Sequence, residues 1–297
     1  MQFPANCSVF ANIRTRLSFP VTALVMALCP LYAQKAPARA TLRVTEPVVS
    51  QFEDGAAIAP SQKVVPGETV FFRYGAADFK TGENGRIQIT GHMQAFDSRG
   101  TAIIARDEVV VATSVRDEDK DWKPRLHFQF QVPSLAPPGP YKIRFEATDD
   151  QTKTTTAGEA TFLVDGHDVP ASPQLVIRNL AFYRTADDAT PIRTAAYRSG
   201  DMVWVKFDIT GYKHGEQQAM DVAYDVAVTA SDGKPLFSQE NAAVERNQAF
   251  YPQPWVPGAF SLTLQPNMRL GEYNVQITAH DAIGKQTAIG KGVFQVQ

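Results

Sequence analysis

The chain has 297 residues, of which 44% are hydrophobic and 20% charged, with 29 basic residues, 31 acidic residues and two cysteines. This composition is typical of a folded protein and is too apolar and too balanced in charge for a disordered one. The net charge of −2 does not predict the clustered basic surface that nucleic acids and acidic membranes require. At roughly 100 to 200 residues per domain, the length predicts about two domains.

The first forty residues have the pattern of a secretory signal. Arg14 and Arg16 precede an apolar run over residues 17–31, which is shorter than the roughly 20 residues of a membrane-spanning helix. We expect cleavage after Ala33 or Ala40, and a secreted or periplasmic protein. The alternative is an uncleaved segment, which would then be the only contact with a membrane.

Both cysteines, Cys7 and Cys29, belong to this segment. The exported chain would therefore contain no cysteine, which excludes disulfides, thiolate metal sites and cysteine nucleophiles from it. Lipidation of Cys29 is disfavoured because Leu28 stands where a lipobox requires a small residue.

The rest of the sequence consists of two similar copies. Gly67 matches Gly200, and the triplet that begins at Trp122 matches the triplet that begins at Trp255. The alignment then loses one residue in the turn after Pro133. We therefore predict a signal and short N-terminal segment over 1–40, a repeat over 41–165, a linker over 166–173 and a second repeat over 174–297.

Apolar residues alternate with polar ones in both repeats, as expected of β-strands with one buried face. The residues predicted to point inward are Val70, Phe72, Tyr74, Ile87, Ile89, Met93 and Ala95 in repeat 1, and Val203, Val205, Phe207, Ile209, Met220, Val222, Tyr224, Val226 and Val228 in repeat 2. No window of comparable length has a helical period. The predicted fold is all-β, with two tandem immunoglobulin-like Greek-key β-sandwiches.

A tyrosine follows a tight turn and opens a strand in each repeat, at Tyr141 and Tyr273. This is the pattern of the tyrosine corner, in which the hydroxyl binds the backbone of the preceding turn. Together with the segments 66–70 and 97–100, it resembles the immunoglobulin-like modules of bacterial secreted proteins. The similarity is greatest to fibronectin type III domains and to the macroglobulin-type domains of bacterial surface proteins.

The resemblance implies a β-sandwich fold. Macroglobulin-type trapping is not implied, because the exported chain lacks the cysteine of a thioester. The two-domain plan also resembles that of periplasmic pilus chaperones, but the cleft signature of those proteins is absent.

Catalytic and metal-binding motifs are missing from the sequence. It contains no H-E-x-x-H, no G-x-S-x-G and no Gly-rich phosphate loop. The acidic run 117–121 could suggest a calcium loop, but Trp122 and Phe128 stand where an EF-hand requires Gly and Glu. Glu83 and Glu216 recur in the repeat, where we expect the motif aromatic-Lys-x-Gly-Glu to build a loop with a local ion pair. No cofactor, metal site or catalytic residue is predicted.

Aromatic side chains are the candidates for binding. Trp122 and Trp255 could be anchors between the sheets, or platforms that stack on sugar rings or hold a partner protein. Alternation places Phe71 and Trp204 on the outward side of equivalent strands, and Phe79 and Tyr212 begin the two recurrent loops. The predicted function is an exported, non-catalytic binding, adhesion or spacer protein that contacts a protein partner. The alternative is a module that binds cell-surface polysaccharide, and a hydrolase or a pilus-type chaperone is less favoured.

Overall fold

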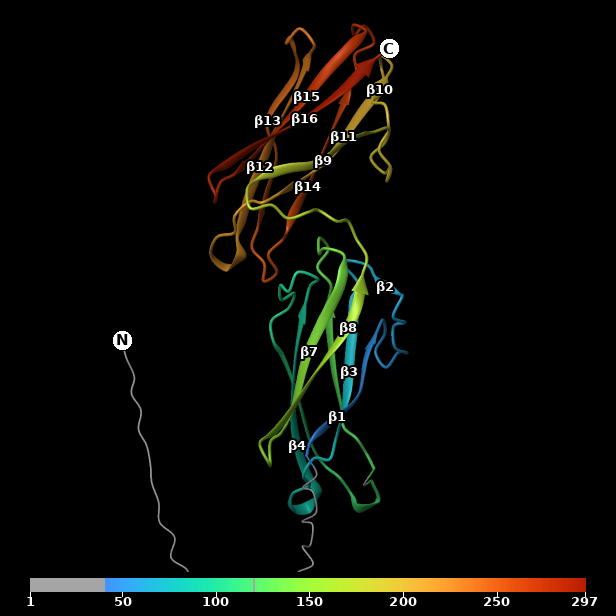
Figure 1. Cartoon of the computed structure of the whole chain (residues 1–297), viewed down its shortest axis with the longest axis vertical. Coiled ribbons are helices and arrows are strands. Elements are labelled where there is room, and N and C mark those ends of the chain that lie inside the picture. Colours follow the sequence, from blue (N-terminus) through green and yellow to red (C-terminus); the bar gives the residue numbers. More distant parts are fainter. Residues whose placement is uncertain (1–40, 120) are drawn as a thin grey trace, which may run out of the picture. The chain divides into compact units, whose positions relative to one another are not determined.

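The computed structural model describes residues 41–119 and 121–297 (Figure 1). The predicted signal, its cleavage sites, Cys7 and Cys29 lie outside the described residues. Within the described part of the chain, no helix is long and apolar enough to cross a membrane.

Eight strands form the first half of the described chain. Their bounds are β1 Arg43–Ser50, β2 Lys63–Val64, β3 Thr69–Ala77, β4 Arg86–Phe96, β5 Asp107–Ser114, β6 Arg125–Gln131, β7 Gly139–Asp149 and β8 Thr154–Val164. They make a three-stranded sheet in the order β1-β3-β6 and a five-stranded sheet in the order β2-β8-β7-β4-β5. The short 3-10 turns η1 Glu83–Gly85 and η2 Asp117–Asp119 connect strands.

The second half repeats this arrangement. Its elements are β9 Val176–Tyr183, β10 Ala196–Tyr197, β11 Met202–Thr210, η3 Glu216–Gln218, β12 Met220–Ala230, β13 Pro235–Asn247, β14 Trp255–Thr263, β15 Gly271–Asp281 and β16 Gln286–Val296. The sheets have the orders β9-β11-β14 and β10-β16-β15-β12-β13 (Figure 1). The strands β3 and β11 begin at matching positions of the sequence repeat, and so do β7 and β15.

This topology confirms the predicted fold class. In each half, the short second strand pairs in parallel with the last strand, whereas the long strands of the same sheet pair antiparallel. In repeat 1, β3 and β6 share one sheet while β4, β5 and β7 share the other, so the chain crosses between the sheets in the manner of an immunoglobulin-like Greek key. The described chain is therefore all-β, with two β-sandwiches.

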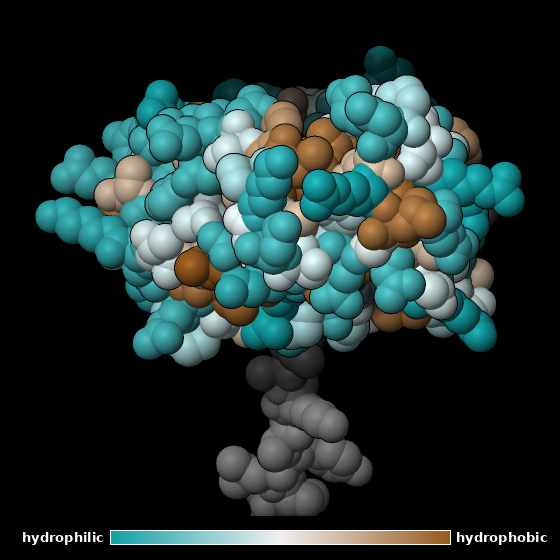
Figure 2. All heavy atoms as spheres, turned by 90° about the horizontal axis from the view of Figure 1, so that it is seen from above, coloured by the Kyte–Doolittle hydropathy of each residue, from teal (hydrophilic) through white to brown (hydrophobic). Residues whose placement is uncertain are grey.

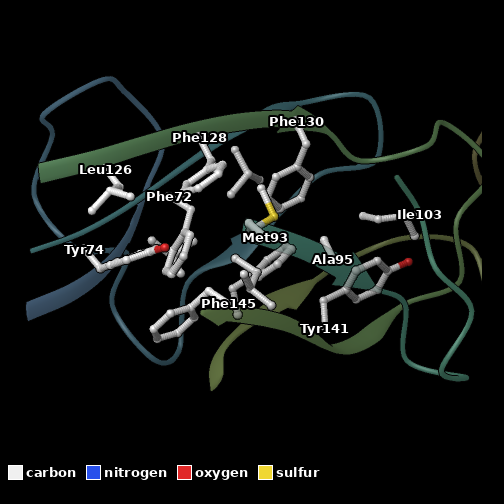
Figure 3. Close-up of a cluster of buried hydrophobic side chains, with 14 of the residues drawn as sticks. Phe72, Tyr74, Met93, Ala95, Ile103, Leu126, Phe128, Phe130, Tyr141 and Phe145 are labelled. Atoms are coloured by element: carbon white, nitrogen blue, oxygen red, sulfur yellow. The ribbon is translucent and has the colours of Figure 1, made fainter. Parts of the chain in front are cut away.

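The core of each sandwich lies between its two sheets. In repeat 1, aromatic side chains from the three-stranded sheet meet those from the five-stranded sheet, with ring centroids of Phe72 and Phe145 5.0 Å apart and those of Tyr74 and Phe145 4.9 Å apart (Figure 3). All the residues predicted to point inward are buried in both repeats. The period-two pattern of the sequence therefore predicted correctly which face of these strands is buried.

Polar side chains cover most of the molecular face drawn in Figure 2, and apolar side chains form only small separate spots there. Large contiguous apolar patches usually mark sites of association. A binding site is therefore better sought in individual hollows of the sheets than on this face.

The two predicted tyrosine corners are present. The Tyr141 hydroxyl donates to the Pro137 carbonyl at 2.8 Å, and the Tyr273 hydroxyl donates to the Arg269 carbonyl at 2.9 Å. Both rings are buried. Each corner therefore ties the turn before β7 or β15 to the strand that follows it.

We expect Tyr141→Phe to lower the free energy of unfolding of the first sandwich by about 1 kcal/mol. The ring stays in place, but the buried hydrogen bond to Pro137 is lost. Urea unfolding followed by tyrosine and tryptophan fluorescence measures the change, and Tyr273→Phe should act similarly on the second sandwich. A wild-type urea midpoint for Tyr141→Phe would contradict the stabilising role of the corner.

Candidate binding face

The outward side of the β1-β3-β6 sheet carries the candidate site. Phe71 and Arg73 point outward from β3, because the residues between and beside them are buried in the core. The register places Phe71 opposite Gln129 and Arg73 opposite His127 on β6. Directly opposite side chains share one face of a sheet. We call these four residues, together with Trp122, the repeat 1 face.

Two hollows lie on the repeat 1 face. The smaller one has a volume of about 270 Å³, and Phe71 lies in its wall. Its lining is Ser50, Glu53, Phe71, Phe72, Arg73, His127, Phe128 and Gln129.

The larger hollow has a volume of about 610 Å³ and includes Trp122, whose exposed fraction is 43%. Gly75 leaves room there, because a Cβ at this position would come within 2.6 Å of the Thr45 hydroxyl oxygen. The lining is Thr45, Glu46, Val48, Arg73, Tyr74, Gly75, Asp121, Trp122, Lys123 and Arg125.

Arg73 lines both hollows. Its side chain is only 18% exposed, and its Nε lies 3.9 Å from an Asp54 carboxylate oxygen, which is also 4.0 Å from Nδ1 of His127. The Nη1 atom of Arg73 is buried and has no hydrogen-bond partner among the described residues. A buried guanidinium nitrogen without a partner is costly, and an oxygen acceptor from a ligand would satisfy it.

Two further cations line the larger hollow. Lys123 and Arg125 take part in no ion pair among the described residues. The acidic side chains of Glu46 and Asp121 lie in the same lining. The hollow therefore combines an exposed indole, unpaired cations and carboxylates, which suits a ligand that has both polar and apolar groups.

The equivalent face of the second sandwich is occupied by its own chain. Trp204 points outward from β11, as predicted, and is partly exposed. Its neighbour Lys206 is not free, since its Nζ donates to the Asp188 carbonyl at 2.8 Å and lies 4.6 Å from the ring centroid of Tyr183.

The linker closes the end of this second face. His167 Nε2 lies 2.7 Å from an Asp208 carboxylate oxygen, and the His167 ring meets the Trp255 ring edge-on at 5.1 Å between centroids. Trp255 is 8% exposed but does not belong to the core between the sheets. It is thus neither an exposed platform nor a core anchor, and the His167 ring of the linker contacts it.

The two tryptophans are not structural equivalents, which corrects the predicted alignment. The last residue of β6, Gln131, pairs with the first residue of β3, and the last residue of β14, Thr263, pairs with the first residue of β11. Counted back along the two strands from these equivalent ends, Trp255 corresponds to Lys123.

The single-residue loss in the alignment therefore precedes β6 and does not follow Pro133. A shift of one residue exchanges the faces of a strand. This explains why the indoles of Trp122 and Trp255 lie in different surroundings.

Phe79 and Tyr212 serve the fold. Phe79 packs partly buried against the first core, while Tyr212 is 6% exposed and its hydroxyl donates to the Gln253 carbonyl. The expected binding role of Tyr212 is therefore corrected, because a covered ring with an occupied hydroxyl offers no contact area to a ligand.

The recurrent loops after these aromatics contain no ion pair, contrary to expectation. Neither Lys80 nor Glu83 forms one among the described residues. Instead, the buried Asp149 carboxylate accepts the Lys80 backbone amide at 2.8 Å, and Asp281 accepts the Lys213 amide at 2.9 Å. A buried carboxylate therefore holds the equivalent loop in each sandwich.

Another hollow, of about 480 Å³, lies over the five-stranded sheet of repeat 1 and includes Phe96 and Arg144. Its charges already have partners. Glu159 binds Arg144 at 3.1 Å and Lys142 at 3.0 Å, and the hydrogen bond from Lys142 is the main reason why the pKa of Glu159 is lowered. Arg106 is similarly paired with Glu146. The repeat 1 face is the stronger candidate, because Lys123 and Arg125 beside it form no ion pair among the described residues.

The described residues were predicted to hold no metal. No group of three or more His, Cys, Asp or Glu residues there could hold a metal ion. Glu83 and Glu216 belong to the equivalent turns η1 and η3 of different sandwiches. Part of the acidic run near Trp122 lies outside the described residues.

Phe71 and Trp122 could be identified from the sequence, but the residues of β6 that lie beside them could not. Alternation along β3 places Phe71 and Arg73 on one side, and this could be read from the sequence. The pairing with His127 and Gln129 requires the register between β3 and β6, which no local pattern specifies.

No family model matches the sequence, and no curated protein matches it. Among solved structures, the C-terminal domain of the antigen I/II-family protein AspA from Streptococcus pyogenes is similar over 85% of this chain and 99% of that one, with 10% identity and a TM-score of 0.30. The C-terminal domain of the AgI/II polypeptide BspA from Streptococcus agalactiae is similar over 84% of this chain and 100% of that one, with 10% identity and a TM-score of 0.29.

The DNA-bound alkylpurine DNA glycosylase AlkC from Pseudomonas fluorescens is similar over 42% of this chain and 30% of that one, with 11% identity and a TM-score of 0.29. The present chain thus spans less than a third of the glycosylase. At these TM-scores, none of the three likenesses carries an argument about the function of this chain.

Proposed function

We propose that this protein is an exported, non-catalytic binding protein that holds a protein partner on the repeat 1 face. The observation that carries the proposal is Arg73, which lines two hollows that contain Phe71 and Trp122 and whose buried Nη1 has no hydrogen-bond partner among the described residues. The basic and apolar N-terminal segment supports export.

A protein segment fits the chemistry of this face. Carboxylate or carbonyl oxygens of the partner would accept hydrogen bonds from Arg73, and its carboxylates would neutralise the charges of Lys123 and Arg125. The apolar side chains of the partner would contact Phe71 and Trp122. Tryptophan and arginine are enriched among the residues that dominate binding energies at protein interfaces. The second sandwich lacks this arrangement, since Lys206 and Trp255 are already engaged within the chain.

Polysaccharide binding is the second candidate, and the exposure of Trp122 favours it. An indole that is 43% exposed beside a hollow can stack on a sugar ring. Acidic sugars would also be attracted by Lys123 and Arg125. This candidate predicts that Trp122 contributes more to binding than Arg73 does, because stacking would then supply the main contact.

We expect a Glu-rich peptide that contains one Phe to bind the full chain, and Arg73→Ala to weaken this binding about tenfold. The loss of the charge-assisted hydrogen bonds is the reason. Isothermal titration calorimetry with this peptide, with alginate as an acidic polysaccharide and with a neutral glucan measures the three affinities. Trp122→Ala is the second variant.

Lys206→Ala and Trp204→Ala are the matched controls, because they are the residues of β11 equivalent to Arg73 and Phe71. Both should bind the peptide like the wild type. Binding of alginate alone, lost in Trp122→Ala, would replace the protein partner by a polysaccharide. If no probe bound in an Arg73- or Trp122-dependent manner, the proposal would be overturned.

A further inference from the structure

Strand β5 is an edge strand without the proline and the register shifts that its duplicate β13, Pro235–Asn247, carries. It is the last strand of its sheet, and its pairing with β4 runs through eight pairs without a bulge. Three consecutive valines, Val109, Val110 and Val111, occupy its centre. Val110 is 48% exposed on the outer side, and the other two are only partly buried against the core.

The equivalent edge strand β13 is blocked in several ways. It begins with Pro235 and has two register shifts against β12, and Asn241, which lies within one of them, has a positive φ of 47°. An acidic residue on the inner side is common to both edges, because Glu245 stands opposite the buried Val222 and Asp107 stands opposite the buried Met93. Proline and bulges are devices by which proteins prevent edge strands from pairing. In one duplicated fold, then, one edge strand carries a proline and register shifts and the other carries neither.

We propose that β5 pairs antiparallel with β5 of a second copy of this chain and so forms a two-fold symmetric dimer. Directly opposite residues of two antiparallel strands point to the same face of the sheet. When the two strands are identical and related by a two-fold axis, this requires a register in which one residue lies opposite the same residue of the second copy. This inference does not depend on the proposed function of the repeat 1 face.

The sequence of β5 fits one such register, centred on Val110. Val109 then lies opposite the second copy's Val111, and Glu108 lies opposite Ala112. Asp107 lies opposite Thr113, so no carboxylate meets another carboxylate. Cross-strand pairs of β-branched residues stabilise a sheet, whereas like charges directly opposite each other destabilise it. The strand is therefore self-complementary, which favours a second copy over an unrelated chain.

Val110→Lys and Val244→Lys test the dimer. Val110 and Val244 are exposed residues on the outer side of equivalent edge strands, opposite Thr90 and Ala223 respectively, so neither change enters a core. In light scattering coupled to size-exclusion chromatography of the full chain, we expect a dimer for the wild type and for Val244→Lys. We expect a monomer for Val110→Lys, because two lysines would face each other at the centre of the pairing.

A cysteine cross-link tests the register. In a chain with Cys7→Ser and Cys29→Ser, we expect Val110→Cys to form an intermolecular disulfide, because opposite residues of antiparallel strands are close enough for one. Val244→Cys should stay largely unlinked. A wild-type monomer at every concentration, or equal cross-linking of the two variants, would overturn the proposal. A dimer that survives Val110→Lys would place the contact elsewhere and would equally reject it.

Discussion

Replacing Asp149 with alanine should lower the free energy of unfolding of the first sandwich by about 3 kcal/mol. The carboxylate is 2% exposed and accepts the backbone amides of Lys80 at 2.8 Å and Gln151 at 2.9 Å. Alanine would leave both amides without partners, and each such loss costs about 1 to 3 kcal/mol. Urea unfolding followed by fluorescence measures the effect.

The second sandwich supplies the matched test. Asp281 accepts the amides of Lys213 at 2.9 Å and Gly284 at 2.8 Å, so Asp281→Ala should destabilise that half by a similar amount. Asp149→Asn should give a smaller loss than Asp149→Ala, because its amide retains one acceptor oxygen. The exposed Asp187 is the control, and its change to alanine should stay within about 0.5 kcal/mol. Equal effects of Asp149→Ala and Asp187→Ala would refute the role given to the buried carboxylate.

In the two repeats, the same part of the core is filled by a large side chain that comes from opposite sheets. We expect that moving the large side chain from one sheet to the other will show strong energetic coupling between the two positions. In repeat 1, Leu126 on β6 lies over Gly91 on β4, where an added Cβ would overlap the leucine and the Tyr74 hydroxyl. In repeat 2, the equivalent positions hold Gly258 and Tyr224, and the tyrosine spans the gap to donate to the Ala259 carbonyl at 2.8 Å. A large residue on one sheet thus accompanies a glycine on the other.

Gly91→Tyr alone should destabilise the first sandwich by about 3 kcal/mol through overpacking. Leu126→Gly alone should cost about 4 kcal/mol through the cavity that it leaves. The double variant should be about 2 kcal/mol more stable than the sum of the two predicts, because the tyrosine fills the cavity. A further Tyr74→Phe change should help, since Phe207 of repeat 2 has no hydroxyl at that position. Additive losses in the double-mutant cycle would contradict this account of the packing.

The fold followed from local pattern because burial of one strand face is a local property. The alternation in residues 70–74 and 203–209 identified the covered sides, and the turn before Tyr141 identified the corner. Asp149 and Asp281 recur at matching positions of the two repeats, but recurrence alone does not indicate their role. Their role depends on contacts with Lys80 and Lys213, which lie far from them in the sequence, and periodicity does not reveal such contacts.

The candidate site was less predictable, because it depends on register and on coverage by distant segments. Matching Trp122 to Trp255 by identity gave the wrong equivalence, since backbone pairing with β11 places Trp255 opposite Thr210. Trp255 also contacts His167, which belongs to the linker and precedes the whole second sandwich. Neither relation leaves a periodic signal in the sequence.

The linker that contacts Trp255 has a consequence for valency. A duplicated protein ordinarily offers two copies of a site, but here the linker and Asp208 close one of them, so each chain is expected to bind its ligand with one-to-one stoichiometry. Two sites would then become available together only in a pair of chains. A ligand displayed repeatedly on a surface would be held by such a pair with an avidity that a single chain cannot reach.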